Sequence, residues 1–252
     1  MAEGGRVGRR GVDGDEGGDA TGRSSFTLTA NIYLHYVFDL WVHQWRGKWA
    51  QGDMIVVRYA DDAVLGFEHR TEAEAFLEQL RERMRKFGLE LHAEKTRLIE
   101  FGRFAEGNRK RRGEGKPETF DFLGFTHISG KTRKGNWFTV RRQTIEKRLR
   151  SKLQAVRQEL HKRWHERIAE TGDWLRSVVQ GYFNYHAAPG NFATLRTFRR
   201  EVARAWLEAL RRRSQRHRLP REKFSSLLDR YLPLPRILHP VPGARFDARH
   251  PR

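Results

Sequence analysis

The fold of this chain is decided first by the stretch Met54-Ile-Val-Val-Arg-Tyr-Ala-Asp-Asp-Ala-Val-Leu-Gly-Phe67. Its β-branched and aromatic residues favour two short strands, Met54–Tyr59 and Ala63–Phe67, joined by a tight turn that carries Asp61 and Asp62. Two adjacent carboxylates conflict with an otherwise apolar hairpin, and such conflicts are expected at functional sites. A hard cation such as Mg²⁺ would resolve the conflict, because its ligands are carboxylate and phosphate oxygens. The alternative is a purely polar turn, in which Asp is common.

The composition restricts the class of protein. Hydrophobic residues make up 38% of the 252, enough for a core, although the mean hydropathy is −0.79. The absence of cysteine excludes disulfides and Cys-based zinc sites. No apolar run approaches the length of a membrane span, and the first residues lack the apolar core of a signal peptide. We therefore expect a cytoplasmic protein without a membrane partner.

The net charge of +19 is concentrated in the second half of the chain. Residues 1–130 contain 20 Lys and Arg against 21 Asp and Glu, whereas residues 131–252 contain 30 against 10. A region with this excess attracts phosphate backbones or anionic membranes, and arginines on helices that also carry aromatic residues favour RNA. The alternative is a solvated basic surface without a specific ligand.

The hydrophobic spacing of the first half predicts two helices around the hairpin. Apolar residues three and four apart predict a largely buried helix over 26–49. A second helix is expected over Thr71–Phe87, with Thr71 and Glu74 as a capping box and Gly88 as its stop.

Strands and a loop are expected after the second helix. Two strands should flank a turn at Ala93–Thr96, and a Gly-, Arg- and Lys-rich exposed loop should cover 102–118. Phe120–Phe125 has the composition of a short aromatic strand, with which Trp137–Val140 would pair.

Helical periodicity dominates from Gln143 onwards. Gly172-Asp173 is expected to break a long first helix, and the second should end near Ala188. Asn191 is expected to cap a third helix, and Pro220 to begin a short fourth one. The sequence thus predicts a mixed α/β part followed by a helical part, with a boundary near residue 141.

Five blocks of the chain, in this order, resemble the group II intron reverse transcriptase/maturase family. They are Leu28-Thr-Ala-Asn-Ile-Tyr-Leu-His35, Arg58-Tyr-Ala-Asp-Asp62, Gly88-Leu-Glu-Leu-His-Ala-Glu-Lys-Thr96, Phe120-Asp-Phe-Leu-Gly-Phe125 and Trp174-Leu-Arg-Ser-Val-Val-Gln-Gly-Tyr-Phe-Asn-Tyr-His186. They are similar to the segment leading into the palm, the catalytic hairpin, the next palm motif, the primer grip and the maturase-specific region. The resemblance spans Leu28 to Leu234.

The resemblance implies an α/β fold: an incomplete reverse-transcriptase palm, with a small antiparallel sheet and helices, followed by an α-helical thumb/maturase domain. The implied division is a disordered tail over 1–25, the partial palm over 26–141, the helical domain over 142–235 and an irregular tail over 236–252. The family's fingers and third catalytic Asp would lie upstream of Ala30, where nothing resembles them. We therefore expect an N-terminally truncated enzyme that is inactive alone, unless a separate chain supplies the fingers.

The resemblance also implies an activity, which is RNA-directed DNA synthesis together with help to intron RNA during splicing. Asp61 and Asp62 would be the catalytic ligands of a two-Mg²⁺ site that is incomplete here. The implied partners are group II intron RNA and an RNA/DNA primer–template. The alternative function is that of a non-enzymatic maturase remnant that binds intron RNA.

Further site residues follow from the same blocks. Contacts to the nucleotide or primer are expected from Asn31, Tyr59, Lys95, Leu123 and Gly124. Their structural alternatives are, in order, a helix cap, core packing, a surface turn and, for the last two, a strand bulge. RNA contacts are expected from Arg176, Tyr182, Asn184, Tyr185, His186, Arg199, Arg200, Arg204, Arg211, Arg212 and Arg213. For the arginines the alternative is a solvated face, and for His186 it is a helix-end residue satisfied by local hydrogen bonds.

One expectation concerns solubility. A shortened palm should leave apolar sheet surface uncovered around Ile55–Val57 and Phe120–Phe122, and should make the isolated chain self-associate.

Overall fold

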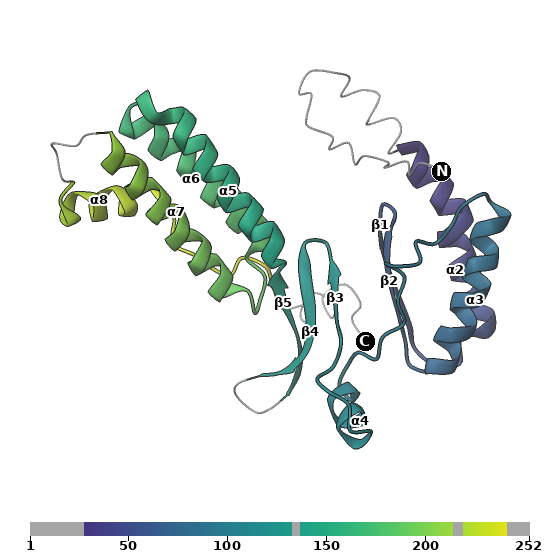
Figure 1. Ribbon diagram of the computed structural model, residues 1–252. Helices are drawn as coiled ribbons and strands as arrows, with labels where there is room; N and C mark the ends of the chain where they lie inside the picture. The colour runs from purple at the N-terminus through teal and green to yellow at the C-terminus, as the bar shows by residue number, and fades with distance from the viewer. Residues whose placement is uncertain (1–27, 133–136, 214–218, 241–252) are drawn as a thin grey trace, which may run out of the picture. The chain divides into compact units, whose positions relative to one another are not determined.

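The computed structural model describes residues 28–132, 137–213 and 219–240 (Figure 1). The chain divides into two compact units, one ending at Leu98 and the other beginning at Ile99. The first is a β-hairpin with helices, and the second combines a three-stranded antiparallel sheet with a mostly helical remainder. The expected α/β class is confirmed. The palm and thumb boundary near 141 stays a prediction, because compact units need not coincide with family domains.

The first unit begins with a helix that changes its winding. Residues 28–34 are α-helical, His35–Asp39 form the π-helical turn η1, and α2 continues over Leu40–Trp49. The strands β1 (Met54–Tyr59) and β2 (Asp62–Phe67) follow as an antiparallel pair. The unit's core forms where these elements meet α3 (Arg70–Lys86). Its buried members are Val37, Phe38, Val42, Trp45, Met54, Phe76, Leu80 and Met84.

Both ends of α3 were predicted, with different outcomes. The capping box is wrong: the helix begins at Arg70, and His69 in the N-cap position makes no side-chain cap bond. The stop at Gly88 is confirmed, since its φ is +66°. The N–H groups of Gly88 and Leu89 donate to the carbonyls of Arg85 and Met84, as in a Schellman motif.

The segment after α3 keeps the predicted turn but not the predicted strands. The Lys95 and Thr96 N–H groups both donate to the His92 carbonyl. Neither flank of this turn is a strand in the part of the chain that the structure describes. Extended backbone becomes a strand only by pairing with a neighbour, and hydrophobic pattern alone does not supply one.

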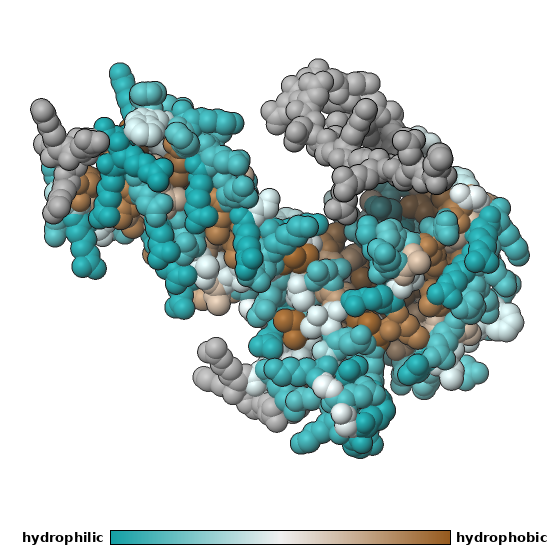
Figure 2. Space-filling view, in the orientation of Figure 1, coloured by the Kyte–Doolittle hydropathy of each residue, from teal (hydrophilic) through white to brown (hydrophobic). Residues whose placement is uncertain are grey.

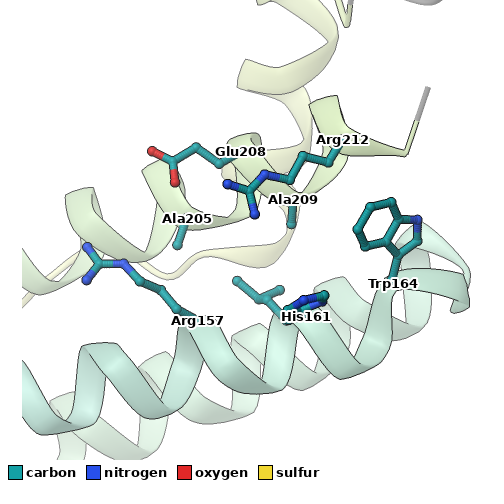
Figure 3. Close-up of a pocket in the computed structure, with 8 residues that line it drawn as sticks. Arg157, His161, Trp164, Ala205, Glu208, Ala209 and Arg212 are labelled. Carbon is teal, nitrogen blue, oxygen red and sulfur yellow. The ribbon is translucent and has the colours of Figure 1, made fainter. Parts of the chain in front are cut away.

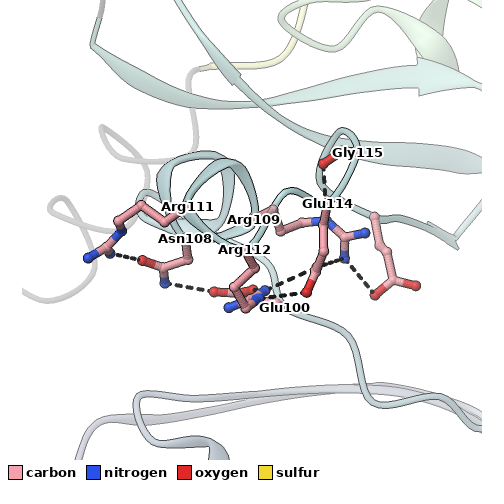
Figure 4. Close-up of polar contacts among 8 residues, drawn as sticks. Glu100, Asn108, Arg109, Arg111, Arg112, Glu114 and Gly115 are labelled. Carbon is pink, nitrogen blue, oxygen red and sulfur yellow. Dashed lines mark hydrogen bonds and ion pairs between the residues drawn. The ribbon is translucent and has the colours of Figure 1, made fainter.

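The second unit opens with a helix that was expected to be loop. Helix α4 (Ala105–Arg111) lies inside the expected loop 102–118, with Ala105 buried. Figure 4 shows the reason: Asn108 donates to Glu100 at 2.7 Å, and Arg112 pairs with both Glu100 and Glu114. These acids pair with basic residues of the segment that was predicted to be an exposed loop.

The sheet of the second unit corrects a predicted strand. Residues Phe120–Phe125 are not one strand, because the chain turns between β3 (Thr119–Phe122) and β4 (Phe125–Lys131). Strand β5 (Phe138–Thr144) pairs with β4, so Trp137–Val140 does not pair with Phe120–Phe122 as expected. The sheet order is β3-β4-β5.

Four helices and one 3₁₀ turn complete the described part of the second unit. They are α5 (Glu146–Lys162), η2 (Arg163–His165), α6 (Ile168–His186), α7 (Phe192–Arg212) and α8 (Arg221–Tyr231). Figure 2 shows hydrophilic side chains over the visible surface of these helices and hydrophobic ones between them. Leu175, Leu195, Phe198 and Trp206 are fully buried in the core they share.

Two further predictions fail in these helices. Gly172 does not break α6. A Cβ at this position would lie 2.6 Å from Cγ of Tyr231, so the glycine makes room for a core ring. Asn191 occupies the N-cap position of α7, but its fully buried side chain does not cap the helix. The start of α8 after Pro220 is confirmed.

The exposed surface agrees in part with expectation. Ile55 and Val57 are 66% and 46% exposed, as expected for an uncovered hairpin face. Phe120 and Phe122 are half-buried instead, and the Phe120 ring stacks on His127 at 4.8 Å. Every helix in the described ranges is too short or too polar to cross a membrane.

Candidate nucleic-acid site

The β1–β2 hairpin presents two acids at its tip. The register pairs Tyr59 with Asp62, which leaves Ala60 and Asp61 as a two-residue turn. The sequence predicted that Asp62 lies in the turn. In the structure Asp62 is instead the first residue of β2. Both carboxylates are exposed, and among the described residues neither has a hydrogen-bond or ion-pair partner. Acids that need no protein partner are available to a cation or a ligand donor.

Arg58 anchors this tip to the first helix. Its Nε and Nη2 donate to Oδ1 and Oδ2 of Asp39 at 2.8 and 2.6 Å. Its Nη1 donates to Oδ1 of Asn31 at 3.0 Å and to the Ala60 carbonyl at 2.8 Å. The hydrogen bond from Arg58 lowers the pKa of Asp39, and the same bond raises the pKa of Arg58. One guanidinium thus ties the turn, β1 and the helix together.

Sequence reasoning missed the Arg58–Asp39 pair, although a signal was present. Met54, Val56 and Arg58 alternate onto the inward face of β1, and a cation in that row requires a partner. Asp39 closes the π-helical turn η1, a feature often found at functional sites. Asn31, expected near the nucleotide, accepts a hydrogen bond from Arg58 in this structure.

The hairpin acids suit Mg²⁺ by donor type. Carboxylates with no protein partner, together with substrate phosphates and water, are the usual ligands of this ion. Among the described residues, however, no group of three or more His, Asp or Glu side chains could hold a metal ion. Asp61 and Asp62 therefore suit such an ion by donor type only, and further oxygen ligands would be needed to hold it.

The other nucleotide candidates of the first unit lie at its surface. Tyr59 is 64% exposed on β1, which excludes the alternative that it packs in the core. Lys95 is exposed in the turn after α3.

In the second unit, the turn between β3 and β4 is strained and firmly held. Leu123 and Gly124 have φ values of +48° and +80°, which the type I′ hairpin turn requires at both central positions. The Tyr185 hydroxyl of α6 donates to the Leu123 carbonyl at 2.8 Å. The Ile145 N–H donates to the Gly124 carbonyl at 3.1 Å. A turn of two residues replaces the bulge considered for this position.

A groove of about 410 Å³ opens beside this turn, between α5 and α6. Two cations of α5 line one side, and aromatic and small polar residues of α6 line the other. The lining residues are Arg148, Lys152, Ser177, Val178, Gly181, Tyr182, Tyr185 and His186. Three of the expected RNA contacts, Tyr182, Tyr185 and His186, are therefore brought together with two cations that were not singled out.

His186 is half-buried in a polar cluster beneath that groove. Its Nδ1 lies 3.2 Å from Oγ1 of Thr144, and the Asn191 amide donates to its carbonyl and to the same Oγ1, both at 2.8 Å. Burial, and then the positive charge of Arg148, lowers the pKa of His186 to about 4. The imidazole is therefore neutral near pH 7.

The expected RNA-contacting arginines fall into two groups. Three of them donate hydrogen bonds to backbone carbonyls of their own unit. Arg176 donates to Arg230, and Arg199 donates to Leu232 and Pro233. Arg213 donates to Arg163 and Glu166. The second group is exposed on α7: Arg200, Arg204, Arg211 and Arg212. Asn184 is exposed on α6, where its Oδ1 accepts a hydrogen bond from Gln180.

Comparison with known proteins gives one family. No curated protein matches the sequence. Residues 25–127 match the family model for reverse transcriptase (RNA-dependent DNA polymerase). They include both the Asp61-Asp62 hairpin and the Leu123-Gly124 turn. Reverse transcriptases copy RNA into DNA, bind nucleic acid and generally use Mg²⁺, and this part of the chain is a reverse transcriptase domain.

Proposed function

We propose that this chain is a reverse transcriptase and maturase of the group II intron type, acting on an RNA/DNA primer–template and on intron RNA. One observation carries the proposal. Two exposed acids, which have no hydrogen-bond or ion-pair partner within the part of the chain that the structure describes, lie at the tip of a hairpin that Arg58 anchors. This hairpin belongs to a stretch that matches reverse transcriptases.

Asp61 and Asp62 are the proposed catalytic residues and the groups that would hold Mg²⁺. When bound, the ion stabilises negative charge on the reacting oxygens of nucleotidyl transfer. The chain's own residues position the acids: Arg58 fixes the carbonyl of Ala60, one residue before Asp61. Tyr59, exposed opposite Asp62, offers a flat apolar surface for a base or sugar.

The second unit supplies the proposed nucleic-acid contacts. The Leu123-Gly124 turn is proposed to lie close to a primer strand. Gly124 itself is buried beside Arg148 and Tyr185, so we propose that these neighbouring side chains make the contacts. In the adjoining groove, Arg148 and Lys152 provide positive charge for phosphates, and Tyr185 provides an aromatic face.

A second function is favoured by one specific observation. No third metal-binding side chain joins Asp61 and Asp62 among the described residues. The alternative is therefore a protein that binds structured RNA and assists splicing without synthesis. Polymerase activity would then require a further carboxylate from elsewhere in the chain or from a separate chain.

Primer extension on an RNA template with Mg²⁺ separates the two. Extension by the purified chain that falls by about 100-fold or more on Asp61→Asn supports the polymerase. Salt-sensitive binding of structured RNA without extension supports the alternative. If the chain neither extends a primer nor binds RNA, both are wrong. The control is Asp53→Asn, which removes an acid from the other end of β1.

A further inference from the structure

A second groove, of about 180 Å³, lies between α5 and α7 (Figure 3). Leu160 of α5 and Ala205 and Ala209 of α7 form its apolar part, and the small alanines leave the space open. Arg157, His161, Trp164, Glu208 and Arg212 form its polar and aromatic rim. An apolar cavity of about 150 Å³ holds benzene, so one planar base has the right size for this groove.

The face of α5 and α7 that contains this groove carries more positive than negative side chains around Glu201. Arg157, Arg200 and Arg204 share the single carboxylate of Glu201, at 3.7, 3.3 and 3.4 Å. The Glu201 side chain is only 16% exposed, whereas the arginines are more than half exposed. One carboxylate cannot neutralise three guanidinium groups, so this face of α5 and α7 retains charge for an anionic ligand.

Trp164 is held in place at one end of the groove. It belongs to η2, whose backbone is tied to the end of α7: Arg213 donates to the Arg163 carbonyl at 3.0 Å and to the Glu166 carbonyl at 2.7 Å. The His161 ring lies 5.9 Å from the Trp164 ring. A half-buried indole on an anchored backbone is suited to stacking on a base.

We propose that the α5–α7 groove binds one unpaired nucleotide of a single-stranded nucleic acid. The base lies against Trp164, and the neighbouring phosphates lie on Arg157 and Arg212. The Glu208 carboxylate accepts a hydrogen bond from an exocyclic amino group, so it favours bases that carry one. This inference rests on the proposed nucleic-acid binding and deepens it, because it assigns a single-strand site separate from the groove beside the Leu123-Gly124 turn.

The decisive test compares single-stranded with double-stranded RNA by fluorescence anisotropy of labelled oligonucleotides. Trp164→Leu should weaken binding of an unstructured single strand by about tenfold or more, the size of one lost base–aromatic stack. Binding of a blunt duplex should change by less than about twofold. The matched control is Trp137→Leu, which removes an exposed tryptophan from the strand end of the same unit and should change neither affinity.

The phosphate contacts are tested by salt dependence. Replacing both Arg157 and Arg212 with Gln should reduce the slope of log affinity against log salt by about 1.4 for single strands, since each contact contributes about 0.7. Arg221→Gln, which removes one exposed arginine from α8, is the control and should leave the slope unchanged.

Outcomes separate this inference from the proposed function. If the unmodified chain binds neither RNA, the nucleic-acid function fails and the inference with it. If it binds both RNAs and Trp164→Leu binds the single strand equally well, the inference alone is overturned. Should Trp164→Leu fail to fold by circular dichroism, Ala209→Leu, which fills the groove from α7, must give the same selective loss. Unchanged single-strand binding by a folded Ala209→Leu variant would also reject the site.

Discussion

The two hairpins of this molecule use the same turn length in different ways. Both place a residue other than glycine at positive φ, Ala60 at +53° and Leu123 at +48°. In the first turn the Arg58 guanidinium donates to the Ala60 carbonyl, and the Asp61 and Asp62 carboxylates have no hydrogen-bond or ion-pair partner among residues 28–132, 137–213 and 219–240. The second turn is held by its own carbonyls, which Tyr185 and Ile145 occupy. The comparison teaches that a strained turn can either present side chains or join a sheet to a helix.

The largest effect is expected where the first hairpin is anchored. Arg58→Met should destabilise the protein by about 2–3 kcal/mol, because the partly buried Asp39 carboxylate loses both hydrogen bonds from Arg58 and keeps only its contact with His35. Urea unfolding measures the loss. Arg81→Met, which removes an exposed ion pair with Glu78 on α3, is the control and should cost less than about 0.5 kcal/mol.

The same pair predicts a dependence on pH. The pKa of Asp39 in the folded protein lies below its ordinary value of 3.8. Its contribution to stability is therefore complete above pH 3.8 and is lost as the pH falls through the folded-state pKa. Arg58→Met should reduce this acid sensitivity, because Arg58 is the main cause of the lowered pKa of Asp39, and an unchanged acid transition would contradict the assignment.

The second hairpin should be most sensitive at Gly124. Gly124→Ala places a side chain at φ +80°, with its Cβ 3.0 Å from Nη1 of Arg148, and should cost about 1–2 kcal/mol. Gly181→Ala is the matched control in α6, where a Cβ meets nothing within 4 Å. It should stabilise the protein by about 0.5–1 kcal/mol, because alanine is the better helix former. Equal effects at the two glycines would contradict the strained turn.

A smaller effect should distinguish the two strained residues. Ala60→Gly should raise the free energy of unfolding by about 0.5–1 kcal/mol, because glycine adopts positive φ without strain. Leu123→Gly should change it by less than about 0.5 kcal/mol, since the half-buried leucine side chain is lost at the same time. Thermal unfolding of both variants checks the difference, and a larger gain at Leu123 would reverse it.

A second dependence on pH is expected at His186. Its folded-state pKa of about 4 lies below the ordinary 6.5, so the unfolded chain binds the proton more tightly. Stability is therefore full above pH 6.5 and falls as the pH drops toward 4. His186→Gln should flatten the stability curve between these values. An equally steep curve in the variant would show that another group is responsible.

Local pattern was sufficient wherever neighbours in sequence decide the conformation. The hairpin strands follow from β-branched alternation, and the end of α3 follows from Gly88, whose positive φ needs no partner far away in the chain. The acids at the hairpin tip were also visible, because two carboxylates stand out against apolar residues. Pattern could not show that Asp62 pairs opposite Tyr59, since register depends on turn geometry.

Other features depend on contacts between residues distant in sequence. Gly172 looked like a helix break, yet Tyr231, 59 residues later, packs its ring where a side chain would lie. Asn191 looked like a cap, yet Thr144 and His186 bind its amide inside the unit. The segment of α4 was predicted to be a loop, because the sequence pattern does not show that Glu100 pairs with Arg112 and accepts a hydrogen bond from Asn108.

The sequence alone therefore determined the acidic β1–β2 hairpin, the end of α3, and the basic, largely helical character of the second half, because these are properties of composition and short-range periodicity. Only the tertiary structure decided which arginines hold the fold together and which face solvent, and it alone formed the α5–α6 and α5–α7 grooves. The physical reason is that a side chain's partner is fixed by packing between distant elements, which periodicity does not encode.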